Sequence, residues 1–256
     1  MTTLLFDRPQ DGVALLRINR PEARNALNQQ VRREMAERLA DLSVDPTIRA
    51  VVLTGNDKAF AAGADLKDMA EASAIDMMLR QNHLFWGALA RFPKPLIAAV
   101  NGLAWGGGCE LAMHADIIVA GPGSSFAQPE IKVGIMPGAG GTQRLARVIG
   151  KHRAMLMALT GQPLDGTQAA AAGLVSVLTE DAAVVPRAIE IAATIAALPP
   201  LAVAQIKEVL LAGLDAPLDT ALALERKAFQ LLFASRDQKE GMQAFLEKRQ
   251  AVFEGR

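Results

Sequence analysis

The chain has 256 residues, enough to bury a sizeable core as one large domain or as one domain with an appendage. Its 27 Lys and Arg residues balance 27 Asp and Glu residues without a basic stripe, so we expect no nucleic-acid partner. The single cysteine, Cys109, excludes an intrachain disulfide and fits a reducing compartment. No signal peptide or membrane span is indicated, and we expect a cytoplasmic protein.

Hydrophobic periodicity predicts the elements along the chain. Short apolar runs between turn residues predict strands, and apolar residues spaced by three or four predict helices. The expected strands cover residues 4–6, 13–19, 50–54, 96–100, 117–120 and 175–178. The expected helices cover residues 28–42, 75–92, 139–149, 153–159, 168–172, 184–198, 201–210, 218–233 and 237–249, and two more begin near residues 66 and 107. Strands first and helices last predict an α/β core with a helical C-terminal region.

The glycines and two carboxylates between residues 94 and 145 point to a functional site. A buried strand at 96–100 is followed by Gly106, Gly107 and Gly108, which open a helix. The first N–H groups of a helix lack intrahelical acceptors and favour a nearby negative oxygen. Glu110 follows Gly107 by nearly one turn, and Glu130 lies twenty residues further on. We interpret the two glutamates as a possible general acid/base pair beside an oxyanion donor.

A second helix start resembles the first. The small-residue loop at 55–65 leads from a strand towards a helix near Leu66, so Ala64 and Gly107 could each supply one N–H to the same oxygen.

Ordinary structural alternatives to a catalytic site remain open. A glutamate in a first helical turn serves the helix dipole, Pro-Glu is a common helix start, and a tight loop needs small residues. A nucleotide loop is disfavoured because GxxxxGK[ST] is absent.

Six segments, in order and at matching spacing, resemble the crotonase superfamily, in particular the enoyl-CoA hydratases. They are RPEARNAL, FAAGADL, KPLIAAVNG, GGGCELA, QPEIKVGIMPGAGGTQRL and EGMQAFLEKR. The resemblance implies an α/β fold in which a spiral of ββα turns, residues 1–195, carries the CoA and active site. A helical C-terminal trimerisation region, residues 196–256, would follow. It also implies a homotrimer or a homohexamer built as a dimer of trimers.

The same resemblance implies the reaction and its residues. The expected function is addition of water across the 2,3 double bond of a trans-2-enoyl-CoA, a hydro-lyase reaction. Ala64 and Gly107 would form the oxyanion hole, Glu110 would activate water and Glu130 would deliver the proton, with Gly138 near the water. Two close carboxyl groups in an apolar pocket resist ionising together, so one stays protonated.

The resemblance further implies a set of CoA-binding and pocket residues. In the core they are Ala23, Arg24, Ala62, Asp65, Leu66 and Lys67, and in the C-terminal helices Phe229, Phe245 and Lys248. Acyl-CoA is the expected substrate, and no separate cofactor is expected. The three histidines are scattered, so we expect no metal site. Cys109 is interpreted as a small buried residue and not as a nucleophile.

Three positions leave the size of the acyl pocket undetermined. Trp105, Leu103 and Ala127 differ from the residues usual in the family. NRPEARNALN and GIMPGAGGTQRL resemble bacterial hydratases of phenylacetate catabolism that act on 2,3-dehydroadipyl-CoA. Two alternatives stay open: a delta-3,delta-2-enoyl-CoA isomerase, and a non-catalytic homologue that binds acyl-CoA or RNA. The presence of Glu110 argues against the isomerase, and the balanced charge argues against RNA.

Overall fold

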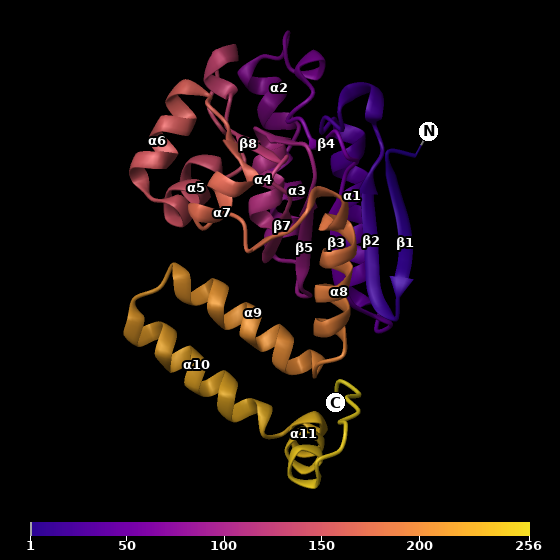
Figure 1. Ribbon diagram of the computed structural model, residues 1–256. Coiled ribbons are helices and arrows are strands. Elements are labelled where there is room, and N and C mark those ends of the chain that lie inside the picture. The colour runs from indigo at the N-terminus through magenta and orange to yellow at the C-terminus, as the bar shows by residue number, and fades with distance from the viewer. Residues whose placement is uncertain (1) are drawn as a thin grey trace.

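The strands divide between two sheets in a computed structural model that describes residues 2–256 (Figure 1). One sheet has the order β1-β2-β3-β5-β7-β10, and the other has the order β4-β6-β8-β9. The strands are β1 (Leu4–Gln10), β2 (Gly12–Ile18), β3 (Ile48–Thr54), β4 (Ala59–Ala61), β5 (Leu96–Val100), β6 (Leu103–Trp105), β7 (Ile117–Ala120), β8 (Ser125–Ala127), β9 (Leu164–Asp165) and β10 (Val177–Leu178).

The helices follow the strands closely in the first half and stand alone in the last quarter. The α-helices are α1 (Gln29–Val44), α2 (Ala74–Leu79), α3 (Asn82–Ala90), α4 (Gly107–His114), α5 (Gly141–Ile149), α6 (Lys151–Thr160), α7 (Gly166–Ala171), α8 (Val184–Ala196), α9 (Pro200–Leu214), α10 (Leu218–Leu232) and α11 (Arg236–Glu247). Short 3-10 turns are η1 (Pro21–Ala23), η2 (Leu66–Asp68), η3 (Glu130–Val133) and η4 (Asp181–Ala183).

Successive turns of the chain repeat one pattern, which forms a spiral. β3, β5 and β7 lie parallel in the larger sheet, and β4, β6 and β8 provide the parallel neighbours of the smaller one. Each turn therefore adds one strand to each sheet before the chain enters helical structure. The predicted antiparallel hairpin is confirmed, because β1 pairs with β2 around Gly12, whose φ is 75°.

The larger sheet is buried on both faces, as its continuous apolar strands predict. In β5, Leu96, Ala98 and Val100 belong to the core shared with α1, α4 and the smaller sheet. The alternate residues Ile97 and Ala99 face α8. Figure 1 shows α8 running along β3 and β5, which it contacts. The strand period of two thus divides the core into two layers.

The smaller sheet corrects the expectation of a loop at residues 55–65, and hydrophobic periodicity did not predict its strands, although the implied spiral of ββα turns requires a second strand in each turn. β4 lies inside the stretch expected to be a loop, and β4, β6 and β8 have three residues each. Such short, alanine-rich strands carry almost no periodic signal. Their pairing comes from the spiral, which brings each one beside the last.

Two helix predictions are also wrong. The helix expected near Leu66 is only the 3-10 turn η2, and the helix expected over 75–92 is broken into α2 and α3. Gln81 at the break has a left-handed φ of 48°, which ends the regular helical path. The predicted α1 is confirmed with its cap, since the Asn28 side chain accepts from Val31 N at 2.9 Å.

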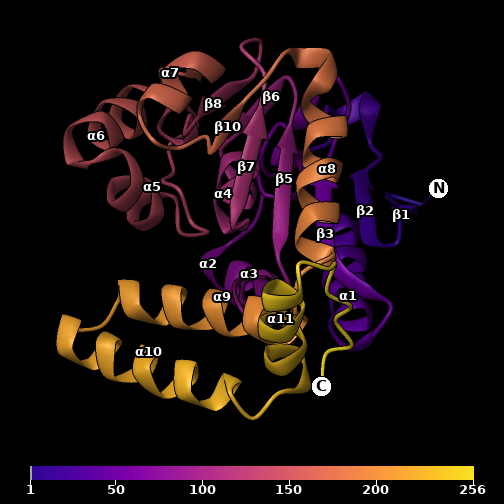
Figure 2. The ribbon, with the colours of Figure 1, turned by 60° about the horizontal axis from the view of Figure 1, so that its bottom comes forward.

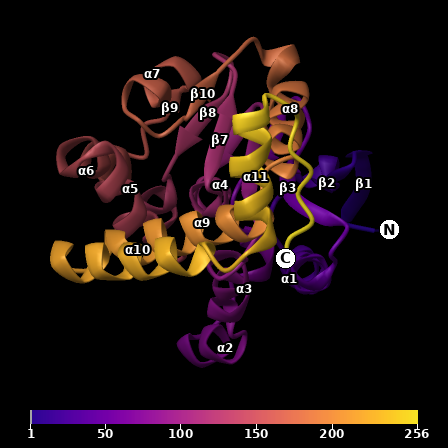
Figure 3. The same cartoon turned by 90° about the horizontal axis from the view of Figure 1, so that it is seen from below.

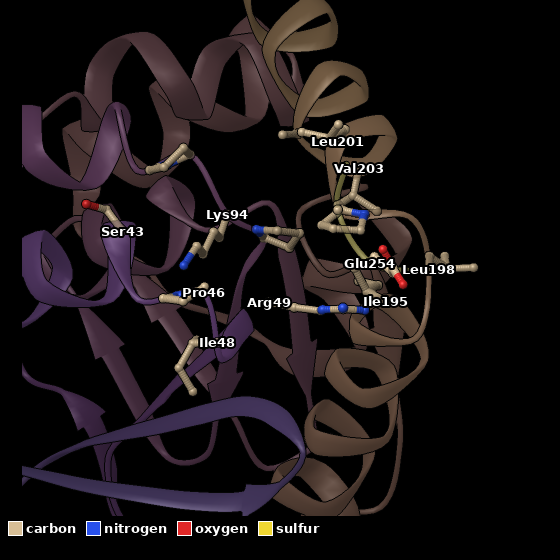
Figure 4. A pocket seen from close by; sticks show the side chains of 15 residues that line it. Ser43, Pro46, Ile48, Arg49, Lys94, Ile195, Leu198, Leu201, Val203 and Glu254 are labelled. Atoms are coloured by element: carbon tan, nitrogen blue, oxygen red, sulfur yellow. The ribbon is translucent and has the colours of Figure 1, made fainter. Parts of the chain in front are cut away.

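The C-terminal helices form a separate layer beneath the spiral. Figures 2 and 3 show α9 and α10 side by side across the underside, with α11 near the C-terminus. Between this layer and the amino ends of β3 and β5 lies a cavity of about 290 Å³ (Figure 4). Its walls come from both parts, with Arg49 and Lys94 on one side and Leu201 and Glu254 on the other. The predicted division at residue 195 stays a prediction.

Within residues 2–256, no single helix is long and apolar enough to cross a membrane, and α8 with α9 reaches that length only across a 110° bend.

Candidate active site

The N-terminus of α4 needs glycine because other groups crowd its backbone. Gly106 caps the helix with φ 51°, and a Cβ there would lie 2.8 Å from Glu130 Oε1. A Cβ on Gly108 would lie 1.9 Å from the carbonyl oxygen of Ala61 in β4. Both positions would clash with any side chain. The glycine run therefore lets α4 begin directly against β4 and beside a carboxylate.

Two backbone N–H groups meet at this helix start. A Cβ on Gly107 would lie 3.5 Å from the nitrogen of Ala64, so the two backbones are close neighbours. Leu27 fixes the Ala64 segment, since its N–H donates to Gly63 O at 2.8 Å. Among residues 2–256, no acceptor is found for the N–H of Ala64 or of Gly107. The predicted donor pair is thus brought together and left free for a negative oxygen.

Glu110 is held inside the site by backbone donors. Glu110 is only 3% exposed. Its Oε1 accepts from Ala139 N at 2.7 Å and from Gly141 N at 2.8 Å. Burial raises the pKa of this carboxyl, while the two N–H bonds and the charge of Arg32 oppose the rise. α5 begins at Gly141 instead of the predicted residue 139, because Gly140 before it has a left-handed φ of 100°.

Glu130 lies on the other side of the α4 start. Its carboxylate accepts from the buried amide of Gln128, assigned with its nitrogen towards Glu130 because both carboxylate oxygens then lie 3.1 Å away. Burial, and then the negative charge of Glu110, raise the pKa of Glu130 to about 7. The two carboxyls therefore have different surroundings: Glu110 accepts from the N–H groups of Ala139 and Gly141, and Glu130 from the Gln128 amide and its own backbone N–H.

Two further polar side chains near the pair, His114 and Cys109, are uncharged at neutral pH. His114 Nδ1 lies 2.8 Å from the carbonyl oxygen of Glu110, its ring stacks on Trp86, and burial lowers its pKa to about 4. Burial and the charges of Glu110 and Glu130 raise the pKa of the Cys109 thiol, so it stays protonated. Neither group adds a base or a nucleophile to the site.

The expected CoA-binding residues gather on one side of the oxyanion hole. Ala62 N donates to Arg24 O at 3.1 Å, which joins the loop containing Ala23 to the segment that leads to Ala64. Arg24, Leu66 and Lys67 are exposed. Asp65 forms an ion pair with Arg20 at 3.0 Å, and its expected contact with the ligand stays a prediction.

The C-terminal candidates lie elsewhere. Phe229 on α10 is 61% exposed and Phe245 on α11 is 83% exposed, and Lys248 is the exposed residue that ends α11. Figures 1 and 2 show both helices apart from α4. Gly138 is exposed and directly precedes Ala139, whose N–H donates to Glu110. Within one chain, then, the structure does not bring the C-terminal candidates to the carboxylate pair.

Sequence reasoning missed several residues of the site. The amide of Gln128 holds Glu130. The N–H groups of Ala139 and Gly141 hold Glu110 from a distant part of the chain, a contact that no local pattern predicts. Arg32 had a usable signal, because it falls among the apolar positions of α1 that face the core. Among residues 2–256, no group of His, Cys, Asp and Glu side chains could hold a metal ion.

The comparison with known families decides the relationship. Residues 8–256 match the family model described as Enoyl-CoA hydratase/isomerase. The chain belongs to this family. The resemblance to the crotonase superfamily is thereby confirmed.

Curated relatives of the enoyl-CoA hydratase/isomerase family align over most of the chain. It is 44% identical to the 2,3-dehydroadipyl-CoA hydratase of Escherichia coli strain K12, over 100% of both chains. It is 48% identical to the mitochondrial enoyl-CoA hydratase of Pongo abelii, over 94% of this chain and 83% of the relative.

Solved structures confirm the spiral fold of the family. The enoyl-CoA hydratase of Bacillus anthracis superimposes with a TM-score of 0.95 at 35% identity, covering 99% of this chain and 100% of that one. The enoyl-CoA hydratase of Mycobacterium tuberculosis H37Rv gives 0.91 at 38% identity, covering 100% of both.

Proposed function

We propose that the protein hydrates trans-2-enoyl-CoA thioesters to 3-hydroxyacyl-CoA. The observation that carries the proposal is the pair of carboxylates, Glu110 and Glu130, on either side of a helix start whose N–H groups lack acceptors. Membership of the family supports acyl-CoA as the substrate. Water and the thioester are the only reactants, so the proposal includes no separate cofactor.

The oxyanion hole acts on the thioester oxygen. As water attacks C3, the π electrons of the C2–C3 bond move towards the thioester carbonyl, and negative charge gathers on its oxygen. The N–H groups of Ala64 and Gly107, which lie close together, would both donate to that oxygen and stabilise its charge in the transition state. Loss of one such donor costs about 100-fold or more in rate.

The two glutamates divide the proton transfers. Glu110 stays ionised more readily because backbone donors and Arg32 stabilise its charge, so it accepts the proton of the attacking water. Glu130 has a pKa of about 7 and supplies a proton to C2. The C3–O bond forms, the enolate returns its electrons to C2, and both carboxyl groups are then restored by proton exchange.

The CoA moiety is proposed to lie along the loop that carries Ala23 and Arg24 and the segment of Ala62, Leu66 and Lys67. The side chains of Arg24 and Lys67 are exposed cations, and they would pair with the negatively charged phosphates of CoA. We place the enzyme in the cytoplasm. Its alignment with a 2,3-dehydroadipyl-CoA hydratase over the whole chain supports a role in phenylacetate catabolism and a carboxylated acyl group.

The oligomer is proposed to be a trimer, or a hexamer built from two trimers. An apolar groove of about 530 Å³ lies between α9 and α10, and Leu210, Leu222 and Phe229 line it. These side chains are 59%, 49% and 61% exposed in the single chain. A second copy would remove this apolar surface from water and could bring Phe229 to a neighbouring active site.

Hydration of crotonyl-CoA, followed by loss of the enoyl thioester absorbance, tests the function. We expect turnover by the wild-type protein and a loss of about 100-fold or more in Glu110→Gln and Glu130→Gln, as for removal of a general acid or base. Glu71→Gln, at an exposed position, is the matched control and should retain full activity. A wild-type protein that shifts a 3-enoyl-CoA to the 2-enoyl isomer without hydrating it would support the isomerase instead. Thioester binding without either reaction would support a binding protein.

A further inference from the structure

A second apolar groove lies on the spiral, between η3, α5 and α6. Its volume is about 360 Å³. Ile131, Met136, Met155 and Leu159 line it, and these side chains are between 47% and 67% exposed. Exposed apolar surface that gathers in one place usually marks an interaction site. The groove is therefore a second surface, besides the one between α9 and α10, that a partner would cover.

The charge around this groove is entirely positive. Between residues 131 and 164 the chain has five Lys and Arg residues and no Asp or Glu. The five cations are Lys132, Arg144, Arg147, Lys151 and Arg153. Lys132, Lys151 and Arg153 are exposed and form no ion pair within residues 2–256, and Lys151 lines the groove itself. We call this surface the basic groove. Because the whole chain is balanced in charge, the matching negative charge lies elsewhere on it.

The groove between α9 and α10 carries the opposite charge. Between residues 208 and 225 the chain has four acidic residues, Glu208, Asp215, Asp219 and Glu225, and no Lys or Arg. Glu225 lines that groove. Of the four, Asp215 alone forms an ion pair within the described chain, with Arg147 at 3.5 Å. The two grooves thus match each other in apolar character and in charge.

The two grooves do not cover each other within one chain. α6 packs on α5 and η3, whereas α10 packs on α9. In Figure 1, α6 lies at the upper left and α10 at the lower left, with α5 and α9 between them. The contact would therefore join two copies. Two different patches of one chain make a heterologous contact, which forms a closed ring if the rotation permits, as in the proposed trimer.

The floor of the basic groove is also a wall of the active site. Pro137 and Gly141 line the groove, and Gly141 N donates to Glu110 Oε1 at 2.8 Å. A Cβ on Gly141 would lie 2.8 Å from Pro137 Cβ and 2.9 Å from Glu110 Oε1. A single residue without a side chain therefore separates the groove from this carboxylate. Ile131, which also lines the groove, directly follows Glu130.

We propose that the basic groove of one copy receives the α9–α10 unit of a second copy, and that this contact braces the loop that holds Glu110. The inference rests on the proposed hydratase function and oligomer, and it names the surface of the spiral that the C-terminal helices cover. Lys151 and Glu225, the charged residues that line the two grooves, would meet across the contact. Pairing of either groove with its own copy is disfavoured, because like charges would then meet.

Exchange of the two charges tests the pairing. The variants are Lys151→Glu, Glu225→Lys and the double variant that carries both. Lys58→Glu, at an exposed position outside both grooves, is the matched control. All three positions are exposed, so the denaturation midpoints should change little. Light scattering over a dilution series gives the dissociation constant of the oligomer.

We expect each single reversal to raise this dissociation constant about 10-fold or more, because like charges then face each other. The double variant should return to within about threefold of the wild-type protein, and Lys58→Glu should not change. At a concentration where Lys151→Glu is dissociated, its kcat with crotonyl-CoA should fall about 10-fold or more, because the loop that places Glu110 loses its support. The double variant should recover this activity.

Other outcomes separate the inference from the function. A wild-type monomer, or a double variant that stays dissociated, would overturn the pairing. Loss of the oligomer in Glu225→Lys but not in Lys151→Glu would also overturn it, because the α9–α10 groove would then face another surface. Full activity of dissociated Lys151→Glu would overturn the bracing of Glu110. Hydration of crotonyl-CoA by the wild-type protein would leave the hydratase function intact in each case. Recovery of the oligomer in the double variant, with no hydration by the wild-type protein, would support the pairing and refute the function.

Discussion

At the scale of single residues, Glu110 and Glu130 are the same side chain in different surroundings. Glu110 accepts from two backbone N–H groups and feels the charge of Arg32, whereas Glu130 accepts from the amide of Gln128. Burial raises the pKa of both carboxyls, and the charge of Glu110 raises that of Glu130 further, to about 7. The difference in donors separates a base from an acid.

This difference predicts the pH dependence of hydration. Glu130 must be protonated to donate, and its pKa of about 7 means that the protonated form is lost as pH rises through that value. We expect kcat/KM to fall about tenfold per pH unit above pH 8, since one essential proton is lost. A profile from pH 5 to 10 in wild type and Glu130→Gln checks it. The variant should lack the alkaline limb, and a flat wild-type profile would contradict the assignment of Glu130 as the acid.

At the scale of elements, the loop at 20–27 fixes one half of the oxyanion hole. Asn25 has a left-handed φ of 59° and is fully buried. Its Nδ2 donates to Ala59 O at 2.7 Å, and its Oδ1 accepts from Arg20 N at 2.9 Å. Asparagine tolerates this backbone conformation and joins the loop to β4. The loop then presents Leu27, which pairs with the Ala64 segment.

Substitution of Asn25 should therefore weaken both the fold and the site. We expect Asn25→Ala to lower the free energy of unfolding by about 2–4 kcal/mol, from two lost hydrogen bonds and an unfavourable left-handed alanine. Asn25→Gly should lose less, because glycine accepts the conformation. Urea denaturation gives the values, and crotonyl-CoA hydration should fall in parallel. A loss below about 0.5 kcal/mol in Asn25→Ala, the size of an ordinary surface change, would refute this anchoring role.

At the scale of the whole molecule, the spiral and the C-terminal layer differ in how much apolar surface they leave exposed. α9 and α10 pack chiefly on each other, and their groove is open to solvent in one chain. A contiguous apolar groove of this kind is typical of an interface. The position of α10 and α11 away from α4 in Figure 2 fits an active site completed by a neighbour.

Charges in the groove should separate the subunits. We expect wild type to run as a trimer or a hexamer and the double variant Leu210→Glu with Leu222→Glu to run as a monomer, because each buried charge would lack a partner. Val44→Glu, at an 80% exposed position at the end of α1, is the control and should retain the oligomer. Light scattering after size-exclusion chromatography measures the mass. A wild-type monomer would rule out the proposed assembly, and an unchanged mass in the double variant would rule out this groove as its interface.

The sequence by itself determined the longer elements and the identity of the two carboxylates. Strands such as β5 and helices such as α1 are long enough for hydrophobic periodicity to define them, and Asn28 marks its helix start chemically. The glycine run before Glu110 indicated an exposed helix N-terminus from local geometry alone. The order and spacing of six segments indicated the family.

Only the tertiary structure decided what surrounds each charge. The three-residue strands of the smaller sheet form because the spiral stacks them, and the donors that hold Glu110 belong to residues about thirty positions away. The burial of Arg32 is likewise decided by the packing of α1 against the core. Local propensity acts over a few residues, whereas burial and hydrogen bonding between distant segments set the chemistry of the site.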